Sequence, residues 1–132
     1  MVRGIKALDA LDGKAYGVPT IVVGTEAANV INVAIQMKNL DEQDMAAACA
    51  VPFYLADDVA GLDPATAAPD GGIVIGTDGA MIEWTGNLSG LLVSEADGDI
   101  DIDMTDAGVM TKYLVLVMPD GSLVVSAAIT WA

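Results

Sequence analysis

Apolar and polar residues alternate with a period of two in several parts of this chain. In residues 30–38 the apolar positions on one side of the alternation are Ile31, Val33, Ile35 and Met37. Successive side chains of a β-strand point to opposite faces, so this pattern predicts a half-buried strand. The run DIDIDM at 99–104 alternates in the same way and predicts a second strand of this kind.

Two further segments have the composition of strands. Residues 49–55 place a set of apolar side chains on one face: Cys49, Val51, Phe53 and Leu55. Pro52 cannot donate a ladder hydrogen bond, which predicts an edge strand or a bulge. Residues 112–132 predict a hairpin around the turn Pro119-Asp120-Gly121, in which glycine supplies a positive φ. Its second strand is predicted to place alternate residues on one face: Leu123, Val125, Ala127, Ile129 and Trp131.

Turn-forming residues separate these segments and point to an all-β fold. Residues 58–71 are rich in Gly, Pro and Asp and predict a loop. No segment has a sustained apolar stripe of period 3.6, and only residues 41–50 are suited to a helical turn or two. About seven short strands with turns every 8–12 residues predict an immunoglobulin-like antiparallel β-sandwich.

The start of the chain differs from the rest. Residues 1–28 lack clear periodicity and predict an extended N-terminal arm with one short strand at 20–23, followed by a sandwich domain at 29–132. Residues 1–14 hold three cations and two acids, which leaves two of the five cations and 17 of the 19 acids for the remainder. The arm is therefore electrostatically distinct from the sandwich.

The strong negative charge narrows the range of partners. A formal net charge of -14 argues against nucleic acid, which is bound through cations, and against anionic membranes. No secretion signal precedes the first acids, which predicts synthesis in a cytoplasm. The chain length suits one domain, and 54% hydrophobic residues suffice for a buried core.

The chain offers little catalytic chemistry. It contains no histidine, which excludes Ser-His and Cys-His systems and leaves a poor ligand set for zinc. No glycine-rich phosphate-binding loop is present. Cys49 lies on an apolar face and is predicted to be a core residue. We therefore predict no enzyme activity, no catalytic residue, no metal ligand and no cofactor.

The stretch SEADGDIDIDMTDAG at 94–108 is the most acidic part of the chain. A calcium loop of the EF-hand type needs Gly at its sixth position and Glu at its twelfth, and neither Asp97 nor Asp99 as first ligand meets this need. A strand would instead present Asp99, Asp101 and Asp103 to solvent, at a repulsion of about 0.6 kcal/mol per pair in water. The strand is the favoured interpretation, and an ion bound at the preceding turn is the alternative.

From about residue 30 onward the chain resembles the small immunoglobulin-like structural proteins of tailed-bacteriophage virions. The pieces VSEADGDIDI and YLVLVMPDGSLVVSAAI carry most of this resemblance. Such proteins are often capsid decoration (cement) proteins or parts of head and tail fibres. The resemblance implies a non-enzymatic protein that stabilises a capsid by binding the major capsid protein lattice. It would be made in the host bacterial cytoplasm and lie on the capsid exterior as a homo-oligomer, for which a trimer is one option.

A decoration protein needs a docking segment, and the N-terminal arm is the candidate. An arm that orders on binding stabilises only the assembled state. The residues predicted to bind the partner are Arg3, Ile5, Lys6, Leu8, Leu11, Lys14 and Tyr16. The alternative function is an adhesion or carbohydrate-binding module of a fibre, calcium-dependent in one version, with its ligand site in loops such as 57–71.

Overall fold

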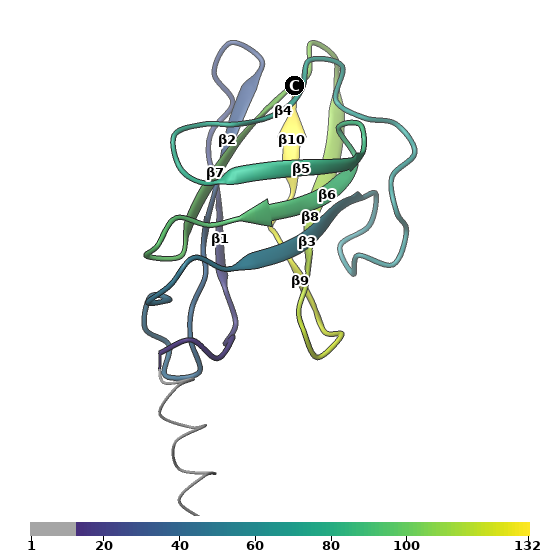
Figure 1. The fold of residues 1–132 in the computed structure, drawn as a ribbon. Coiled ribbons are helices and arrows are strands. Elements are labelled where there is room, and N and C mark those ends of the chain that lie inside the picture. Colours follow the sequence, from purple (N-terminus) through teal and green to yellow (C-terminus); the bar gives the residue numbers. More distant parts are fainter. Residues whose placement is uncertain (1–12) are drawn as a thin grey trace, which may run out of the picture.

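The computed structural model describes residues 13–132, which form two antiparallel β-sheets and no helix (Figure 1). None of these residues belongs to a helix able to cross a membrane. The strands are β1 (Thr20–Val23), β2 (Val30–Gln36), β3 (Ala50–Ala56), β4 (Gly72–Ile75), β5 (Ala80–Thr85), β6 (Ser89–Val93), β7 (Asp99–Thr105), β8 (Met110–Val117), β9 (Leu123–Val125) and β10 (Ile129–Trp131).

The two sheets form a sandwich, as the alternation predicted. The first sheet has the order β1-β2-β7-β4, and the second has the order β10-β8-β3-β6-β5, with β9 also paired to β8. All of these pairings are antiparallel. The arrangement confirms an all-β sandwich and is consistent with an immunoglobulin-like fold.

The core lies between the sheets and uses the predicted faces. β2 and β7 both alternate strictly between buried and half-buried residues, which confirms the strands expected at 30–38 and 99–104. The second sheet contributes buried residues of β3, β6, β8 and β10. The largest fully buried side chains include Trp131, Phe53, Ile31, Ile35, Met37, Leu55, Leu92, Ile100, Ile102 and Met104.

Pro52 lies in a central strand, so the prediction of an edge or a bulge is wrong. β3 is hydrogen-bonded to β6 on one side and to β8 on the other. The Leu55 N–H points toward β6, where it donates to Leu88 O at 2.9 Å. Because successive main-chain N–H groups of a strand point to opposite sides, the nitrogen of Pro52 points toward β8. The β3–β8 pairing begins only at Phe53, and the missing N–H of Pro52 therefore breaks no ladder bond.

The hairpin after β8 forms as predicted, but its second half does not keep one face throughout. Gly121 has a φ of 85°, and its N–H donates to Met118 O at 2.8 Å. The pairing Val125↔Val115 is followed by Ile129↔Lys112, so the returning chain holds one extra residue, which is a β-bulge. The bulge separates β9 from β10 and reverses the alternation. As a result Ile129 and Trp131 are buried, but Ala127 is exposed.

The segment at 41–50 and the boundary of the N-terminal arm also differ from the prediction. The chain at 41–50 forms turns, bends and an isolated bridge at Asp44, without a helix. The strand expected at 20–23 is present as β1, and it pairs with β2 over its full length. Residues 20–23 therefore belong to the first sheet, and a boundary between arm and sandwich at residue 28 does not match this pairing.

Candidate docking site at the base of the arm

Residues 13–18 lie against the loop that follows β2. The Gly17 N–H donates to Lys38 O at 2.8 Å, and Tyr16 forms an isolated bridge with Asn39. A Cβ at residue 17 would lie 2.1 Å from the Asn39 carbonyl oxygen, so this approach requires glycine. The base of the arm is therefore fixed to the sandwich by main-chain contacts.

Tyr16 attaches the same segment to the second sheet. Its hydroxyl donates to Ala50 O at 2.9 Å and accepts from the Ala50 N–H at 3.1 Å. These two bonds satisfy the main chain of β3 where no neighbouring strand pairs with it on this side. Burial raises the pKa of Tyr16, as does the nearby Cys49, so the hydroxyl stays protonated and able to donate at neutral pH.

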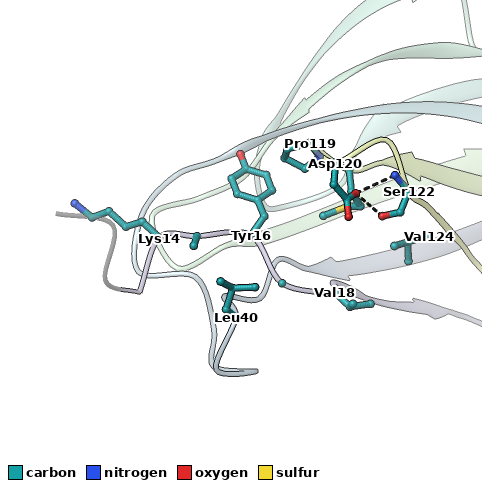
Figure 2. A pocket seen from close by; sticks show the side chains of 11 residues that line it. Lys14, Tyr16, Val18, Leu40, Pro119, Asp120, Ser122 and Val124 are labelled. Atoms are coloured by element: carbon teal, nitrogen blue, oxygen red, sulfur yellow. Dashed lines mark hydrogen bonds between the residues drawn. The ribbon is translucent and has the colours of Figure 1, made fainter. Parts of the chain in front are cut away.

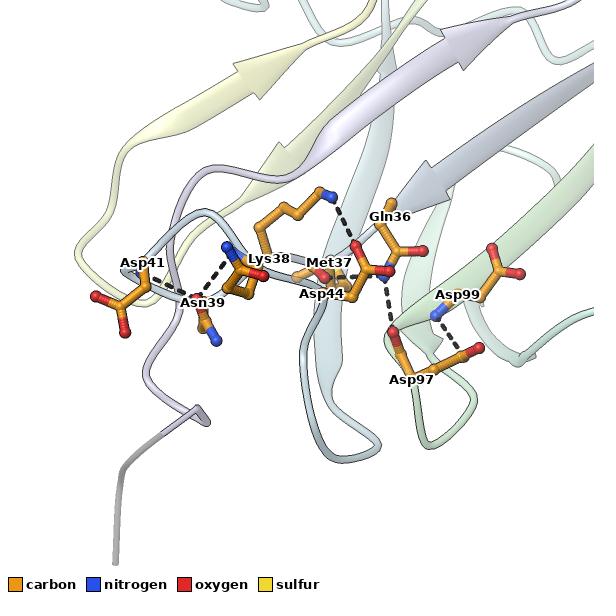
Figure 3. Close-up of polar contacts among 9 residues, drawn as sticks. Gln36, Met37, Lys38, Asn39, Asp41, Asp44, Asp97 and Asp99 are labelled. Carbon is orange, nitrogen blue, oxygen red and sulfur yellow. Dashed lines mark hydrogen bonds and ion pairs between the residues drawn. The ribbon is translucent and has the colours of Figure 1, made fainter. Parts of the chain in front are cut away.

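The loop after β2 is held in one shape and presents an apolar side chain. Asn39 is buried, and its Oδ1 accepts from two main-chain N–H groups of the same loop at 2.9 and 3.1 Å. Lys38 Nζ pairs with Asp44 Oδ1 at 2.6 Å (Figure 3). Leu40 extends from this loop with 72% of its surface exposed. An exposed leucine on a constrained loop is suited to contact with another molecule.

A groove of about 580 Å³ lies between the arm base, this loop and the β8–β9 turn (Figure 2). Its apolar lining includes Tyr16, Val18, Leu40, Met118, Pro119 and Val124. Lys14 lies at the end of the groove away from Val124. A second hollow of about 570 Å³ along residues 17–20 and 38–42 shares Gly17, Val18 and Leu40 with it. The two hollows adjoin at these residues beside the base of the arm, and the second is also lined by polar residues, Thr20, Lys38, Asn39 and Glu42.

The polar side chains of the β8–β9 turn at the groove are hydrogen-bonded to each other. Asp120 Oδ1 accepts from the Ser122 hydroxyl at 2.6 Å and from the Ser122 N–H at 2.9 Å. Both bonds lower the pKa of Asp120, the hydroxyl bond most, which keeps a negative charge at this edge. The groove can therefore hold an apolar segment of chain by burial, with one carboxylate at its edge to favour a cation.

The groove includes two of the predicted partner-binding residues. Lys14 and Tyr16 line it, although Tyr16 also holds the sandwich together through Ala50. The other five, Arg3, Ile5, Lys6, Leu8 and Leu11, lie outside the described residues. Sequence reasoning missed the facing wall, namely Val18, Leu40, Met118, Pro119 and Val124. The available signal was Leu40, a lone leucine in a polar loop.

The acidic stretch is a strand, and its central carboxylate has a structural role. Asp101 Oδ1 accepts from the N–H groups of Thr77 and Asp78, both at 2.7 Å, and Asp101 Oδ2 accepts from Asn32 Nδ2 at 3.1 Å. Burial acts to raise the pKa of Asp101, but these hydrogen bonds together outweigh it and lower the pKa. Asp101 therefore fixes the β4–β5 turn to β7.

The turn before this strand is tied to β2. Gln36 Nε2 donates to Asp97 O at 2.7 Å and to Met37 O at 3.0 Å (Figure 3). Burial raises the pKa of Asp99, and the nearby charge of Asp78 raises it further. Within residues 13–132 no group of three or more His, Cys, Asp or Glu side chains is arranged to hold a metal ion.

Asp106 is the buried carboxylate of the stretch. It is 5% exposed, and it accepts from the N–H of Asp70 at 2.9 Å and of Gly108 at 2.7 Å. Asp70 in turn accepts from the Ala107 N–H at 3.0 Å. Each carboxylate thus accepts a hydrogen bond from a main-chain N–H in the loop that holds the other carboxylate. These bonds link the chain before β4 to the chain after β7.

The loop named for the alternative function folds back onto the second sheet. Tyr54 Oη donates to Gly61 O at 2.5 Å. Gly61 has a φ of 73° and packs so closely on Val115 and Val125 that a Cβ would lie 3.0–3.1 Å from their methyl groups. The first part of the loop at 57–71 therefore covers the outer side of β8 and β9.

Comparison with known proteins adds no family to this description. The chain matches none of the protein-family models and none of the curated proteins with which it was compared.

Proposed function

We propose that the protein is a non-enzymatic virion component that decorates a bacteriophage capsid. In this proposal it binds the lattice of major capsid protein with its N-terminal arm and with the groove at the base of that arm. Binding stabilises the assembled capsid because the contacts exist only when neighbouring capsid subunits are in place.

The observation that carries this proposal is the position of the groove. Residues 13–18 are fixed to the sandwich through Gly17 and Tyr16, and the groove begins at these same residues. A partner that contacts residues 14–18 would therefore lie beside Leu40 and the β8–β9 turn. A fixed base limits the orientations available to the bound partner, which lowers the entropy lost on binding.

The distribution of charge also favours the arm as the segment that binds an acidic partner. The described residues hold 17 acids and three lysines, and two of these lysines form ion pairs, Lys38 with Asp44 and Lys112 with Asp57. The cationic side chains of residues 1–14 are thus the main positive charges that the chain can offer to an acidic partner. The acidic remainder would keep neighbouring decorated particles apart.

Deleting residues 1–12 tests the arm and leaves Tyr16 in place. We expect the shortened chain to fold and to lose binding to capsids assembled without the decoration protein, as measured by co-sedimentation. Full binding by the shortened chain would overturn the proposal.

A point substitution tests the groove separately. Leu40→Asp places a charge at the groove and should weaken capsid binding, because the carboxylate would lose its hydration. Leu62→Asp is a matched control, since Leu62 is also an exposed loop leucine but does not line the groove. Equal binding by the two variants would contradict a role for the groove.

A further inference from the structure

The outer face of the second sheet carries no charged side chain on its paired positions. Inward-facing and outward-facing residues alternate in β3 and β6, and Val51, Phe53 and Leu92 are among those that point into the core. The registers then assemble the outward residues into rows across three strands. One row is Ile82, Leu91 and Pro52, and the next is Ala80, Val93 and Ala50.

The part of this face around β5 and β6 lies away from the loop at 57–71. The loop at 57–71 covers β8 and β9 through Gly61, but the row through Ile82 lies on the other side of β3. Ile82 is 56% exposed, and Trp84, the unpaired residue at the register shift two residues further along β5, is 61% exposed. We call these residues, together with Leu91, Val93 and Pro52, the uncharged face. Its large exposed apolar side chains are typical of an interface.

The outer face of the first sheet, in contrast, carries several carboxylates. β7 presents Asp99, Asp101 and Asp103 there, next to Asn32 and Gln36 of β2. Two copies of a chain with a net charge of -14 repel each other over most of their surfaces. The uncharged face lets two copies meet without bringing these rows of carboxylates together.

The edge of the second sheet is less suited to such a contact than its face. Among the strands of residues 13–132, β5 pairs only with β6, and its register shifts between Glu83 and Thr85. A bulge of this kind twists an edge strand and opposes pairing with another edge. Burial of Ile82 and Trp84 by a flat contact requires no ladder and suits an apolar surface on the partner.

We propose that the uncharged face is the self-association surface, and that its occupant is the same face of a second copy of this chain. Like faces related by a symmetry axis form a closed contact, and neither copy needs to supply a basic patch. This inference concerns the protein free in solution and does not rest on capsid binding. It should hold equally for the chain that lacks residues 1–12.

Sedimentation of the full chain over a range of concentrations tests the proposal. We expect concentration-dependent association that Ile82→Asp weakens by roughly tenfold or more, because a carboxylate would have to be dehydrated in the contact. Val74→Asp is the matched control: Val74 is 57% exposed on an edge strand, but on the acidic outer face of the first sheet. It should leave association unchanged.

Tryptophan fluorescence gives a second measurement that needs no charge substitution. Trp131 is fully buried, so quenching by acrylamide reports mainly on Trp84, and Trp84→Phe supplies the background. We expect quenching to fall as the protein concentration rises. A chain that stays monomeric, an equal effect of the two Asp variants, or association without protection of Trp84 would each overturn the proposal. So would a monomer whose Trp84 is protected only by another protein.

Discussion

Asp101 and Asp99 lie on the same face of the same strand, yet the structure predicts opposite effects when each carboxylate is removed. Asp101 accepts hydrogen bonds from three residues, and two of those bonds come from main-chain N–H groups at 2.7 Å. Within residues 13–132 no main-chain N–H donates to the Asp99 carboxylate, which instead faces a second carboxylate, Asp78; burial raises the pKa of Asp99, and the charge and side-chain hydrogen bond of Asp78 both raise it further. Asp101→Ala should therefore destabilise the fold, and Asp99→Ala should leave it unchanged or slightly more stable.

The size of the effect follows from these contacts. A hydrogen bond to a charged acceptor contributes about 1.5–3 kcal/mol, but the donors near Thr77 are partly exposed and can bond to water in the variant. We therefore expect Asp101→Ala to lower the free energy of unfolding by roughly 2–3 kcal/mol in total. For a domain of this size each kcal/mol corresponds to about 3–5 °C in melting temperature.

The pH dependence distinguishes the two carboxylates further. Asp101 has a lowered pKa, so its stabilising contribution is complete above the ordinary aspartate pKa of 3.8 and is lost as the pH falls through the lower folded value. Asp99 has a raised pKa, so its ionised form opposes folding at neutral pH, and this opposition is relieved as the pH falls through the raised value toward 3.8.

Thermal and urea denaturation of the two variants and the unmodified chain, from pH 7 down to about 3, measures both effects. The difference between Asp101→Ala and the unmodified chain should shrink at the acidic end. Equal melting temperatures for the two variants at pH 7 would refute the structural role assigned to Asp101.

Two further substitutions examine the base of the arm. Tyr16→Phe removes the hydroxyl bonded to β3 and should lower the free energy of unfolding, measured by denaturation, by about 1–2 kcal/mol. It should also speed hydrogen exchange at residues 14–18. Tyr113→Phe is its control, and equal stability of the two variants would contradict the role assigned to the Tyr16 hydroxyl. Gly17→Ala should also destabilise, since its Cβ would meet a carbonyl oxygen at 2.1 Å, whereas Gly86→Ala meets no atom closer than 3.8 Å and should melt like the unmodified chain.

Much of the fold could be predicted from local patterns. The alternation in β2 and β7 correctly identified the buried residues, because a strand between core and solvent must place every second side chain inward. The turn at Gly121 was also predictable, since few residues tolerate its φ. Two of the predictions that were wrong, at Pro52 and after Val125, concern which strand lies beside which and where a bulge falls.

The candidate surfaces depended on those same non-local relations. The groove joins residues 14–18 with Leu40 and the turn after β8, and the uncharged face joins β5, β6 and β3. Alternation along a strand states which side of the strand a residue occupies, but not which strands are its neighbours. The sequence by itself determined an acidic all-β protein with a cationic start, whereas strand order decided where apolar residues gather, because surfaces form across strands that are distant in the chain.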